Sequence, residues 1–401
     1  MKSTLIKNVR LHGQTGSQDI LIEQGQITRI GRALSAPAHA DPSNANIVEG
    51  HHRLALPGFI DGHAHIDKSL WGMDWYENQV PRELPAIIEN ERHFRRHNDF
   101  DSRQQSERIA RQAIRLGTTH IRTHIDVDTE IGLKHMEGVL ATKEKLAGQV
   151  YIETVCFPQS GLLGRPGTLA LMDEALKLGA DYVGGIDPSS FERNPVAHID
   201  AVFDLACRHG KGIDLHLHEA GDLGAFSVEL ITERTLALGL QGKVTISHAF
   251  CLGEVDAGYQ DRLIEGLARA DIAIATTAPA NRAVPPYEKL RAAGIRVTAG
   301  NDGIRDTWSP YGNADMLQRA MLMGLKYRWR QDRELDQALH AITQGGAEVM
   351  GLANYGLAEG CQADLVLLDA RVPAEAIVEP PRDRTVFKAG TMVADRGECL
   401  F

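Results

Sequence analysis

The sequence predicts an α/β protein, a (β/α)8 TIM-like barrel with a small β-sandwich domain built from both chain ends. Two observations support this prediction. Short β-branched runs alternate with helical segments through the middle of the chain, and β-rich stretches stand at both of its ends. A length of 401 residues also accommodates a barrel of about 250 residues together with a small second unit.

The β-rich ends predict one domain made from two distant segments. Near the start, strands are expected over 4–9, 19–23 and 26–30, separated by turns with Gly and Gln. Near the end, a strand is expected over 363–369 and a hairpin around Ala389 and Gly390. Because the two ends of a domain often lie close together, we expect 1–55 and 360–401 to form the β-sandwich domain and 56–359 to form the barrel.

The middle segment predicts the barrel strands. A first strand ends at His65, and seven more are expected over 120–127, 150–157, 180–186, 212–218, 244–249, 272–276 and 294–299. Helical patterns are clearest over 103–116, 167–178 and 196–209. The resulting count of eight βα units is the count of a closed barrel.

Composition narrows the class of protein. Hydrophobic residues make up 43% of the chain and charged residues 24%, and the formal net charge is -10. An acidic chain without a basic stretch is not expected to bind a nucleic-acid polymer. No apolar run approaches the roughly 20 residues that span a membrane, and the first residues lack a signal-peptide core. Five scattered cysteines without a Cys-x-x-Cys spacing predict neither a disulfide framework nor a zinc ribbon, so we expect a cytoplasmic protein.

The motif with the most chemical information is the run from Pro57 to His65, Pro-Gly-Phe-Ile-Asp-Gly-His-Ala-His. Side chains at i and i+2 of a strand point to the same face, so His63 and His65 can reach one metal ion. Alone, the pair is also compatible with a polar strand rim without a metal. His216 and Asp302 stand at the ends of two other expected strands, however, and barrel enzymes place their working residues there. These four residues predict a site for one divalent metal ion per subunit, and the donor set leaves Zn2+ and Fe2+ open.

Other polar residues near the same strand ends predict the proton-transfer groups. Glu219 follows His216 by three residues and is placed to move protons, while Asp302 is both a ligand and a base for water. His248 ends another strand and is expected beside the attacking water or the leaving group. We interpret His218 as a support for the ligands, although strand alternation leaves it open as a ligand itself. For His124, a hydrogen bond to the ligands and a purely structural role stay open.

Over nearly its whole length, the chain resembles the cytosine deaminase branch of the amidohydrolase superfamily. The resemblance rests on 58–68, 122–126, Phe157-Pro158-Gln159, His216 with Glu219, Ser247-His248, and 300–317. It implies a (β/α)8 barrel, one divalent metal and a homo-oligomer. It implies His63, His65, His216 and Asp302 as ligands, Glu219 as the proton shuttle and His248 beside the hydroxide. It further implies that Gln159 reads a carbonyl and a ring N–H, that Trp308 forms a wall, and that Leu84 packs on the ring.

The resemblance implies a metal-dependent hydrolytic deaminase of a free cytosine-like base, with a small heterocycle as its only partner besides further subunits. Two departures concern the substrate: Gly303 stands where bacterial cytosine deaminases have a second aspartate, and Asn301 stands in place of a histidine. We expect Gly303 to leave room for a ring substituent. The run from His65 to Lys68 also resembles relatives that remove amines from triazine rings. The alternatives are therefore 5-methylcytosine, isoguanine or an aminotriazine as substrate, and, as a different class, a non-catalytic scaffold.

Overall fold

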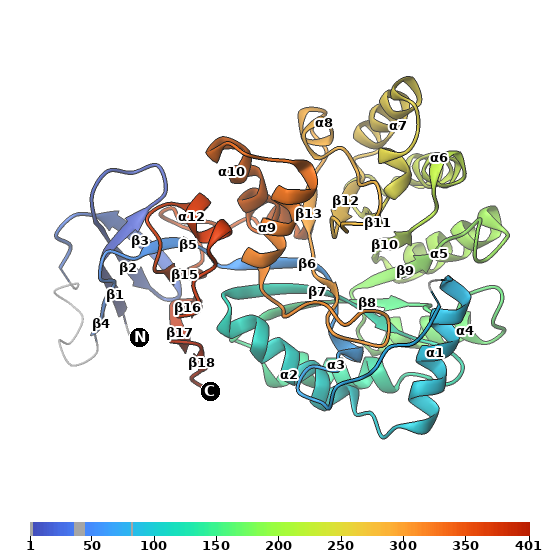
Figure 1. Cartoon of the computed structure of the whole chain (residues 1–401), viewed down its shortest axis with the longest axis horizontal. Coiled ribbons are helices and arrows are strands. Elements are labelled where there is room, and N and C mark those ends of the chain that lie inside the picture. Colours follow the sequence, from blue (N-terminus) through green and yellow to red (C-terminus); the bar gives the residue numbers. More distant parts are fainter. Residues whose placement is uncertain (1–2, 36–44, 82) are drawn as a thin grey trace.

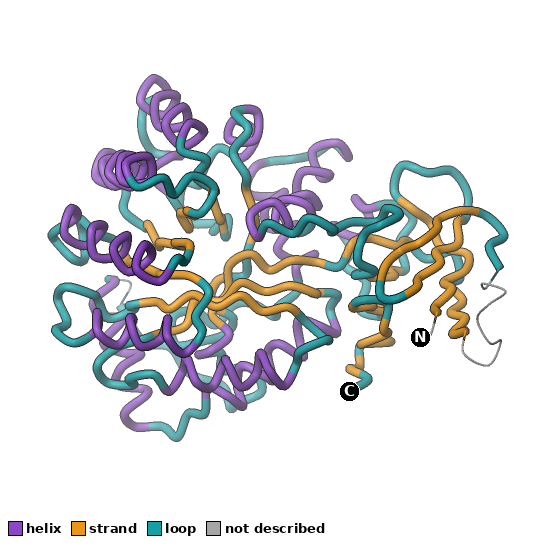
Figure 2. Tube along the Cα trace, turned by 180° about the vertical axis from the view of Figure 1, so that it is seen from behind, coloured by secondary structure: helices purple, strands orange, loops and turns teal. Residues whose placement is uncertain are grey.

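The computed structural model describes residues 3–35, 45–81 and 83–401. In this part of the chain, eight parallel strands form the barrel, and helices cover them on the outside (Figures 1 and 2). The barrel strands are β6 (Phe59–His65), β7 (Thr118–Asp126), β8 (Tyr151–Phe157), β9 (Tyr182–Ile186), β10 (Gly212–Leu217), β11 (Val244–His248), β12 (Ala273–Thr276) and β13 (Val297–Ala299). Each predicted barrel strand is confirmed, with shifts of a few residues at its ends.

The barrel closes through a two-residue strand, β14 (Asp302–Gly303), which the sequence did not predict. It follows β13 directly and pairs in parallel with the first barrel strand, β6, so that Asp302 lies opposite Ala64. This closure requires a glycine at 300, because a Cβ there would lie 2.3 Å from the His63 carbonyl oxygen. The first and last strands therefore approach each other at the residues predicted to bind the metal.

The outer helices follow ordinary start and stop signals. In α5, for example, the Asn194 side chain accepts from the Ala197 N–H, Pro195 is the first helical residue, and Gly210 ends the helix in the left-handed conformation. The helices are α1 (Leu84–His97), α2 (Ser102–Arg115), α3 (Lys134–Lys145), α4 (Thr168–Leu178), α5 (Pro195–His209), α6 (Gly221–Ala237), α7 (Ala257–Arg269), α8 (Tyr287–Ala292), α9 (Met316–Tyr327), α10 (Asp332–Ala341), α11 (Gln344–Met350) and α12 (Pro373–Val378). Among the described residues, none of the helices combines the length and the apolar character needed to cross a bilayer.

A second, mixed sheet contains strands from both ends of the chain, as predicted. The first and the last strands of the described chain both lie in it (Figure 1). Its strands are β1 (Ser3–Leu11), β2 (Gln18–Glu23), β3 (Gln26–Gly31), β4 (Ala45–Glu49), β5 (Leu54–Pro57), β15 (Leu365–Leu368), β16 (Arg384–Lys388), β17 (Thr391–Asp395) and β18 (Glu398–Cys399). The antiparallel pair β5–β15 joins the two segments. We keep the domain limits 1–55 with 360–401, and 56–359, as a proposal.

The barrel interior contains an ionic cluster as well as apolar side chains. Arg122 on β7 is fully buried and donates to Glu153 at 2.8 Å and to both Asp214 and Thr245 at 3.2 Å. Because a buried charge is tolerated only when it is paired, each of these residues depends on the others. The cluster connects the barrel floor to the site above it through Asp214.

Candidate active site

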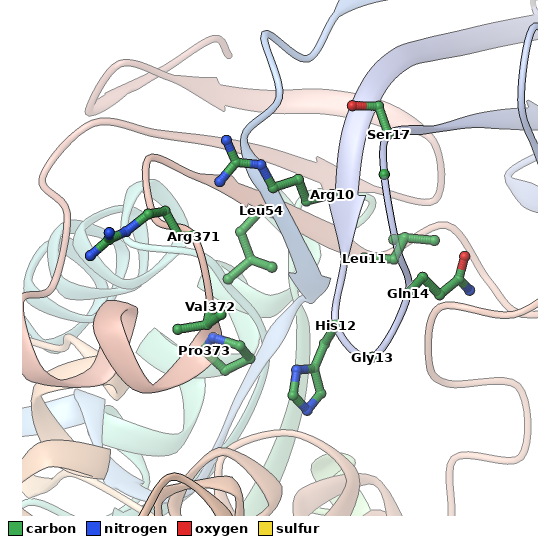
Figure 3. A pocket seen from close by; sticks show the side chains of 11 residues that line it. Arg10, Leu11, His12, Gly13, Gln14, Ser17, Leu54, Arg371, Val372 and Pro373 are labelled. Atoms are coloured by element: carbon green, nitrogen blue, oxygen red, sulfur yellow. The ribbon is translucent and has the colours of Figure 1, made fainter.

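The predicted site residues surround one large cavity at the carboxyl ends of the barrel strands. The cavity has a volume of about 1650 Å³. Its lining includes eight of the nine predicted site residues, Leu84, His65, Gln159, His216, Glu219, His248, Asp302 and Trp308. The ninth, His63, is fully buried beneath it. A smaller hollow of about 210 Å³ between Arg10, Leu54 and Arg371 (Figure 3) holds none of them.

Strand register brings the four predicted ligands together. Asp302 on β14 pairs with Ala64, between His63 and His65 of β6. His216 on β10 pairs with Ser247 of β11, one residue before His248. Ligands that are up to 240 residues apart in the sequence thus meet because parallel strands end at the same edge of the barrel.

The spacing of the donor atoms suits a single ion. His65 Nε2 lies 3.2 Å from His216 Nε2, and Asp302 Oδ1 lies 3.5 Å from His65 Nε2 and 3.6 Å from His63 Nε2. Two ligand atoms bound 2.0–2.1 Å from a tetrahedral ion stand about 3.4 Å apart. His63 Nε2 is also buried without a hydrogen-bond partner among the described residues. The residues present therefore fit a divalent metal, and the ligand assignment remains our proposal.

Burial favours the neutral form of the His65, His216 and His248 imidazoles, and a histidine must be neutral to bind a metal. Burial, helped by the nearby Lys68 ammonium, lowers the pKa of His65 to about 3. Burial also lowers the pKa of His216 and of His248 well below the ordinary value. For Asp302, burial alone would raise the pKa, but His248 and His63 outweigh it and lower the pKa well below the usual range. The site thus combines neutral imidazoles with an ionised carboxylate.

A chain of hydrogen bonds orients His63 from below. Ser247 Oγ donates to Asp214 Oδ1 at 2.6 Å and lies 2.9 Å from His63 Nδ1. Asp214 is ion-paired with Arg122, so its carboxylate accepts the single hydroxyl proton of Ser247. His63 Nδ1 must then be the donor to Ser247, which leaves the lone pair of Nε2 free for an ion. The sequence analysis did not assign Ser247 this role.

Two more histidines enter the cluster. The His248 ring centroid lies 4.8 Å from that of His63 and 5.1 Å from that of His216. The His124 centroid lies 4.3 Å from that of His63, and neither nitrogen of His124 has a hydrogen-bond partner among the described residues. Of the two roles left open for His124, the hydrogen bond to the ligands is therefore not observed among the described residues. His248 and Asp302 have positive φ angles of 71° and 66°, and such backbone conformations in non-glycine residues concentrate at functional sites.

Glu219 is held rigidly at the cavity wall. Its Oε1 accepts from the backbone N–H groups of Ser189 at 2.7 Å and Ser190 at 2.6 Å, and its Oε2 accepts from Ser227 Oγ at 2.5 Å. The carboxylate is only 3% exposed. These three donors come from outside the motifs noticed in the sequence. They hold the predicted proton shuttle in one orientation next to the His216 strand end.

Lys68, Gln159 and Trp308 form another part of the cavity wall. Lys68 Nζ donates to Gln159 Oε1 at 2.8 Å and lies 5.3 Å from the Trp308 ring centroid. Trp308 Nε1 in turn donates to Glu91 Oε2 at 2.8 Å. We expected Gln159 to offer an acceptor and a donor equally. Since Lys68 occupies its oxygen, the amide N–H2 is the group most available to a ligand.

His218 lies in the cavity wall rather than behind the ligands. Its Nδ1 pairs with Asp187 Oδ2 at 2.8 Å, and its ring stacks on that of His248 with centroids 4.4 Å apart. Burial opposes a charge on His218, but the carboxylate of Asp187 outweighs it and raises the pKa above the ordinary value. His218 and Lys68 are both cavity residues to which sequence reasoning gave no contact with substrate. The sequence did contain a signal for both residues, since His218 follows His216 by two residues and Lys68 follows His65 by three.

The expectation that Gly303 leaves an open space is wrong. A Cβ built on Gly303 would lie 2.1 Å from Asp306 Oδ2, so the Asp306 carboxyl group already fills this position. Asp306 is 3% exposed and lines the cavity. The carboxylate that is missing at 303 is thus supplied from three residues further along the chain.

Comparison with known proteins agrees with this geometry. The model of the amidohydrolase family matches residues 95–396. The chain belongs to the amidohydrolase family. It is similar to the crystal structure of N-isopropylammelide isopropylaminohydrolase from Burkholderia multivorans, with 48% identity, a TM-score of 0.95 and full coverage of both chains. It is also 30% identical to N-isopropylammelide isopropyl amidohydrolase of Pseudomonas sp. (strain ADP) over 97% of this chain and 96% of that one.

A further solved relative acts on a different ring. The chain is 28% identical to 5-methylcytosine deaminase from Klebsiella pneumoniae, with a TM-score of 0.84 and coverage of 98% and 97% of the two chains. Family membership therefore confirms the resemblance at the level of the amidohydrolases. The narrower cytosine deaminase branch stays a prediction.

Proposed function

We propose that the protein hydrolyses an exocyclic C–N bond of an oxo-substituted aminotriazine with an alkylated amine, of the N-isopropylammelide type. The observation that carries this proposal is the cavity itself, whose lining contains three of the proposed metal ligands together with two hydrogen-bond donors, Lys68 and Gln159. Donors suit the oxygens of a dioxo ring better than the mixed edge of cytosine. Full-length similarity to two proteins named for N-isopropylammelide supports the same substrate class.

A divalent ion held by His63, His65, His216 and Asp302 would supply Lewis acidity and activate water as a nucleophile near neutral pH. The protein residues position the ring and move the protons. Trp308 stacks on the planar ring, while Lys68 and the Gln159 amide bind its oxygens.

Glu219 takes one proton from the attacking water and delivers it to the nitrogen side of the bond that breaks, and Asp302 accepts the other proton and returns it to the products. The water oxygen replaces nitrogen on the ring carbon. The alkylamine leaves with one proton of the water, and the other remains on the oxo ring. His248, neutral and stacked on His218, contacts the attacking oxygen.

A second candidate, deamination of cytosine or 5-methylcytosine, is favoured by the similarity to 5-methylcytosine deaminase. It uses the same residues and releases ammonia instead of an alkylamine. Homo-oligomer formation and the choice between Zn2+ and Fe2+ also remain predictions.

The test is an amine-release assay with zinc-loaded and iron-loaded protein. N-isopropylammelide, cytosine, 5-methylcytosine, isoguanine and an unalkylated aminotriazine are offered separately, and isopropylamine and ammonia are measured. We expect isopropylamine from N-isopropylammelide as the fastest release. Faster ammonia release from a cytosine would overturn the proposal in favour of the second candidate. Failure to retain metal or to release any amine would indicate a non-catalytic scaffold, and the Glu219→Gln variant controls for contaminating enzymes.

A further inference from the structure

The pair formed by Gly303 and Asp306 places a carboxylate oxygen at the cavity wall. Asp306 Oδ2 lies where a Cβ of residue 303 would otherwise be, 2.1 Å from that position, and Asp306 Cγ lies 3.0 Å from it. Gly303 pairs with His65 in the register of β14 and β6. The Asp306 carboxyl group therefore lies against the strand end that carries a predicted metal ligand.

The two oxygens of Asp306 have different surroundings. Oδ1 accepts from the backbone N–H groups of Trp308 at 2.8 Å and Ser309 at 2.9 Å, which fixes the side chain. Oδ2 accepts no hydrogen bond from the described residues. Oδ2 is not among the buried atoms of the described residues that lack a partner, so it is open to the cavity. An acceptor that receives no hydrogen bond from the protein is free to accept one from a molecule that enters the cavity. Because Asp306 lines the cavity together with Lys68, Gln159 and Trp308, a ligand can provide that partner.

We infer that Asp306 Oδ2 accepts a hydrogen bond from a ring N–H of the substrate and so selects rings in which an N–H adjoins an oxo group. This inference rests on the proposed function and adds the residue that reads the ring edge. Lys68 and Gln159 donate to the oxo groups, and Asp306 accepts from the nitrogen between them. Donors and acceptor together match the edge of an imide or lactam.

The pKa of the Asp306 carboxyl group agrees with an Oδ2 atom that accepts no hydrogen bond from the protein. Burial raises the pKa of its carboxyl group to about 7, even though the Lys68 ammonium lowers it. The Lys68 ammonium pairs with Asp126 at 3.2 Å and with Glu91 at 3.4 Å, and among the described residues it donates no hydrogen bond to Asp306. A ring N–H would satisfy the ionised carboxylate where the protein does not.

The test uses Asp306→Asn, which is nearly isosteric. The amide oxygen keeps the two hydrogen bonds from Trp308 and Ser309, and only the pocket-facing atom changes from an acceptor to a donor. Asp256→Asn is the matched control, because Asp256 Oδ1 accepts in the same way from the backbone N–H groups of Gly258 at 2.9 Å and Tyr259 at 3.0 Å. Asp256 does not line the cavity.

Turnover of N-isopropylammelide provides the first readout. We expect kcat/KM of Asp306→Asn to fall about 10- to 100-fold, mainly through KM, with unchanged metal content and with Asp256→Asn equal to wild type. Binding provides a second readout that does not depend on turnover. Uracil and 1,3-dimethyluracil are titrated calorimetrically at about pH 8, where the carboxylate is ionised. Wild type should prefer uracil, and Asp306→Asn should lose that preference by about 10-fold.

The two readouts separate the possible failures. If wild type does not hydrolyse N-isopropylammelide but prefers uracil in an Asp306-dependent way, the proposed function fails and the inference stands. If turnover or the uracil preference is the same in Asp306→Asn and wild type, or if wild type binds uracil no better than its dimethyl form, the inference is overturned.

Gly303→Ala provides an independent variant, because its Cβ must displace the Asp306 carboxyl group. Its loss should be similar to that of Asp306→Asn and should not add to it in the double variant. Additive losses would overturn the inference.

Discussion

Removing the hydroxyl group of Ser247 should weaken metal binding without removing a ligand. In the structure, Ser247 Oγ connects His63 Nδ1, at 2.9 Å, to Asp214 Oδ1, at 2.6 Å. Ser247→Ala leaves Nδ1 of His63 buried without an acceptor, so neither the tautomer nor the ring orientation is held for metal binding.

The size of the expected loss of metal affinity follows from the interactions that Ser247→Ala leaves intact. Asp214 keeps its ion pair with Arg122 at 3.2 Å, so the barrel floor should stay intact. Loss of a group that orients a metal-binding histidine typically lowers metal affinity about 10- to 100-fold, which corresponds to about 1.4–2.7 kcal/mol. The free energy of unfolding of the metal-free protein should fall less, by about 1 kcal/mol for one lost hydrogen bond.

Competition with a fluorescent chelator measures the zinc affinity of wild type and variant. Ser106→Ala is the matched control, because Ser106 is equally buried and its Oγ lies 2.8 Å from Thr142 Oγ1, in the helical layer outside the barrel. The reasoning is refuted if Ser247→Ala binds zinc within twofold of wild type, or if Ser106→Ala loses affinity to the same extent.

Three further predictions concern the shuttle, the barrel floor and pH. Glu219→Gln should abolish amine release while metal content stays normal, and wild-type turnover in this variant would exclude the proton shuttle. Arg122→Met leaves Asp214 and its neighbours buried without a counter-charge and should lower the free energy of unfolding by about 3–5 kcal/mol in urea titrations, whereas Arg208→Met at the surface should change it little. The pKa of Asp306 is raised to about 7, so the folded state binds this proton more strongly than the unfolded state. The free energy of unfolding should therefore decline from about pH 4 to about pH 7 more in wild type than in Asp306→Asn. Over the same range, the affinity of wild type for substrate should rise as the carboxylate ionises. Equal pH profiles of wild type and Asp306→Asn would contradict this prediction.

The barrel could be predicted from the sequence because its strands carry local signals. The strand expected over 150–157 is observed as Tyr151–Phe157, and the one expected over 244–249 as Val244–His248. Helix α1 was not predicted, since its 14 residues are mostly polar and charged. Its position depends on tertiary ion pairs instead: Arg95 pairs with the buried Asp126 of the barrel, and Glu91 pairs with Lys68 at 3.4 Å. Such long-range pairs leave no periodic pattern in the sequence.

The predicted ligands illustrate the same distinction within the site. His63, His65, His216 and Asp302 could be proposed because each stands at the end of a strand, and parallel strands bring their ends together. Lys68, His218 and Asp306 lie in the connections that follow those strands. Where a connection places its side chains depends on packing against other connections, so sequence position alone did not reveal their common cavity.

Position 303 shows why the reaction class was easier to predict than the substrate. Judged alone, a glycine in place of an aspartate means a lost carboxylate and a larger pocket. In the folded chain the missing Cβ is what admits the Asp306 carboxyl group to the same wall, so the charge is kept while its attachment point moves by three residues. The proposed ligands depend on strand register and tolerate no such exchange, because a shift of one residue turns a side chain to the other face of its strand. A pocket wall made from connections can present the same group from a different residue, and the ring that it selects therefore depends on Gly303 and Asp306 together.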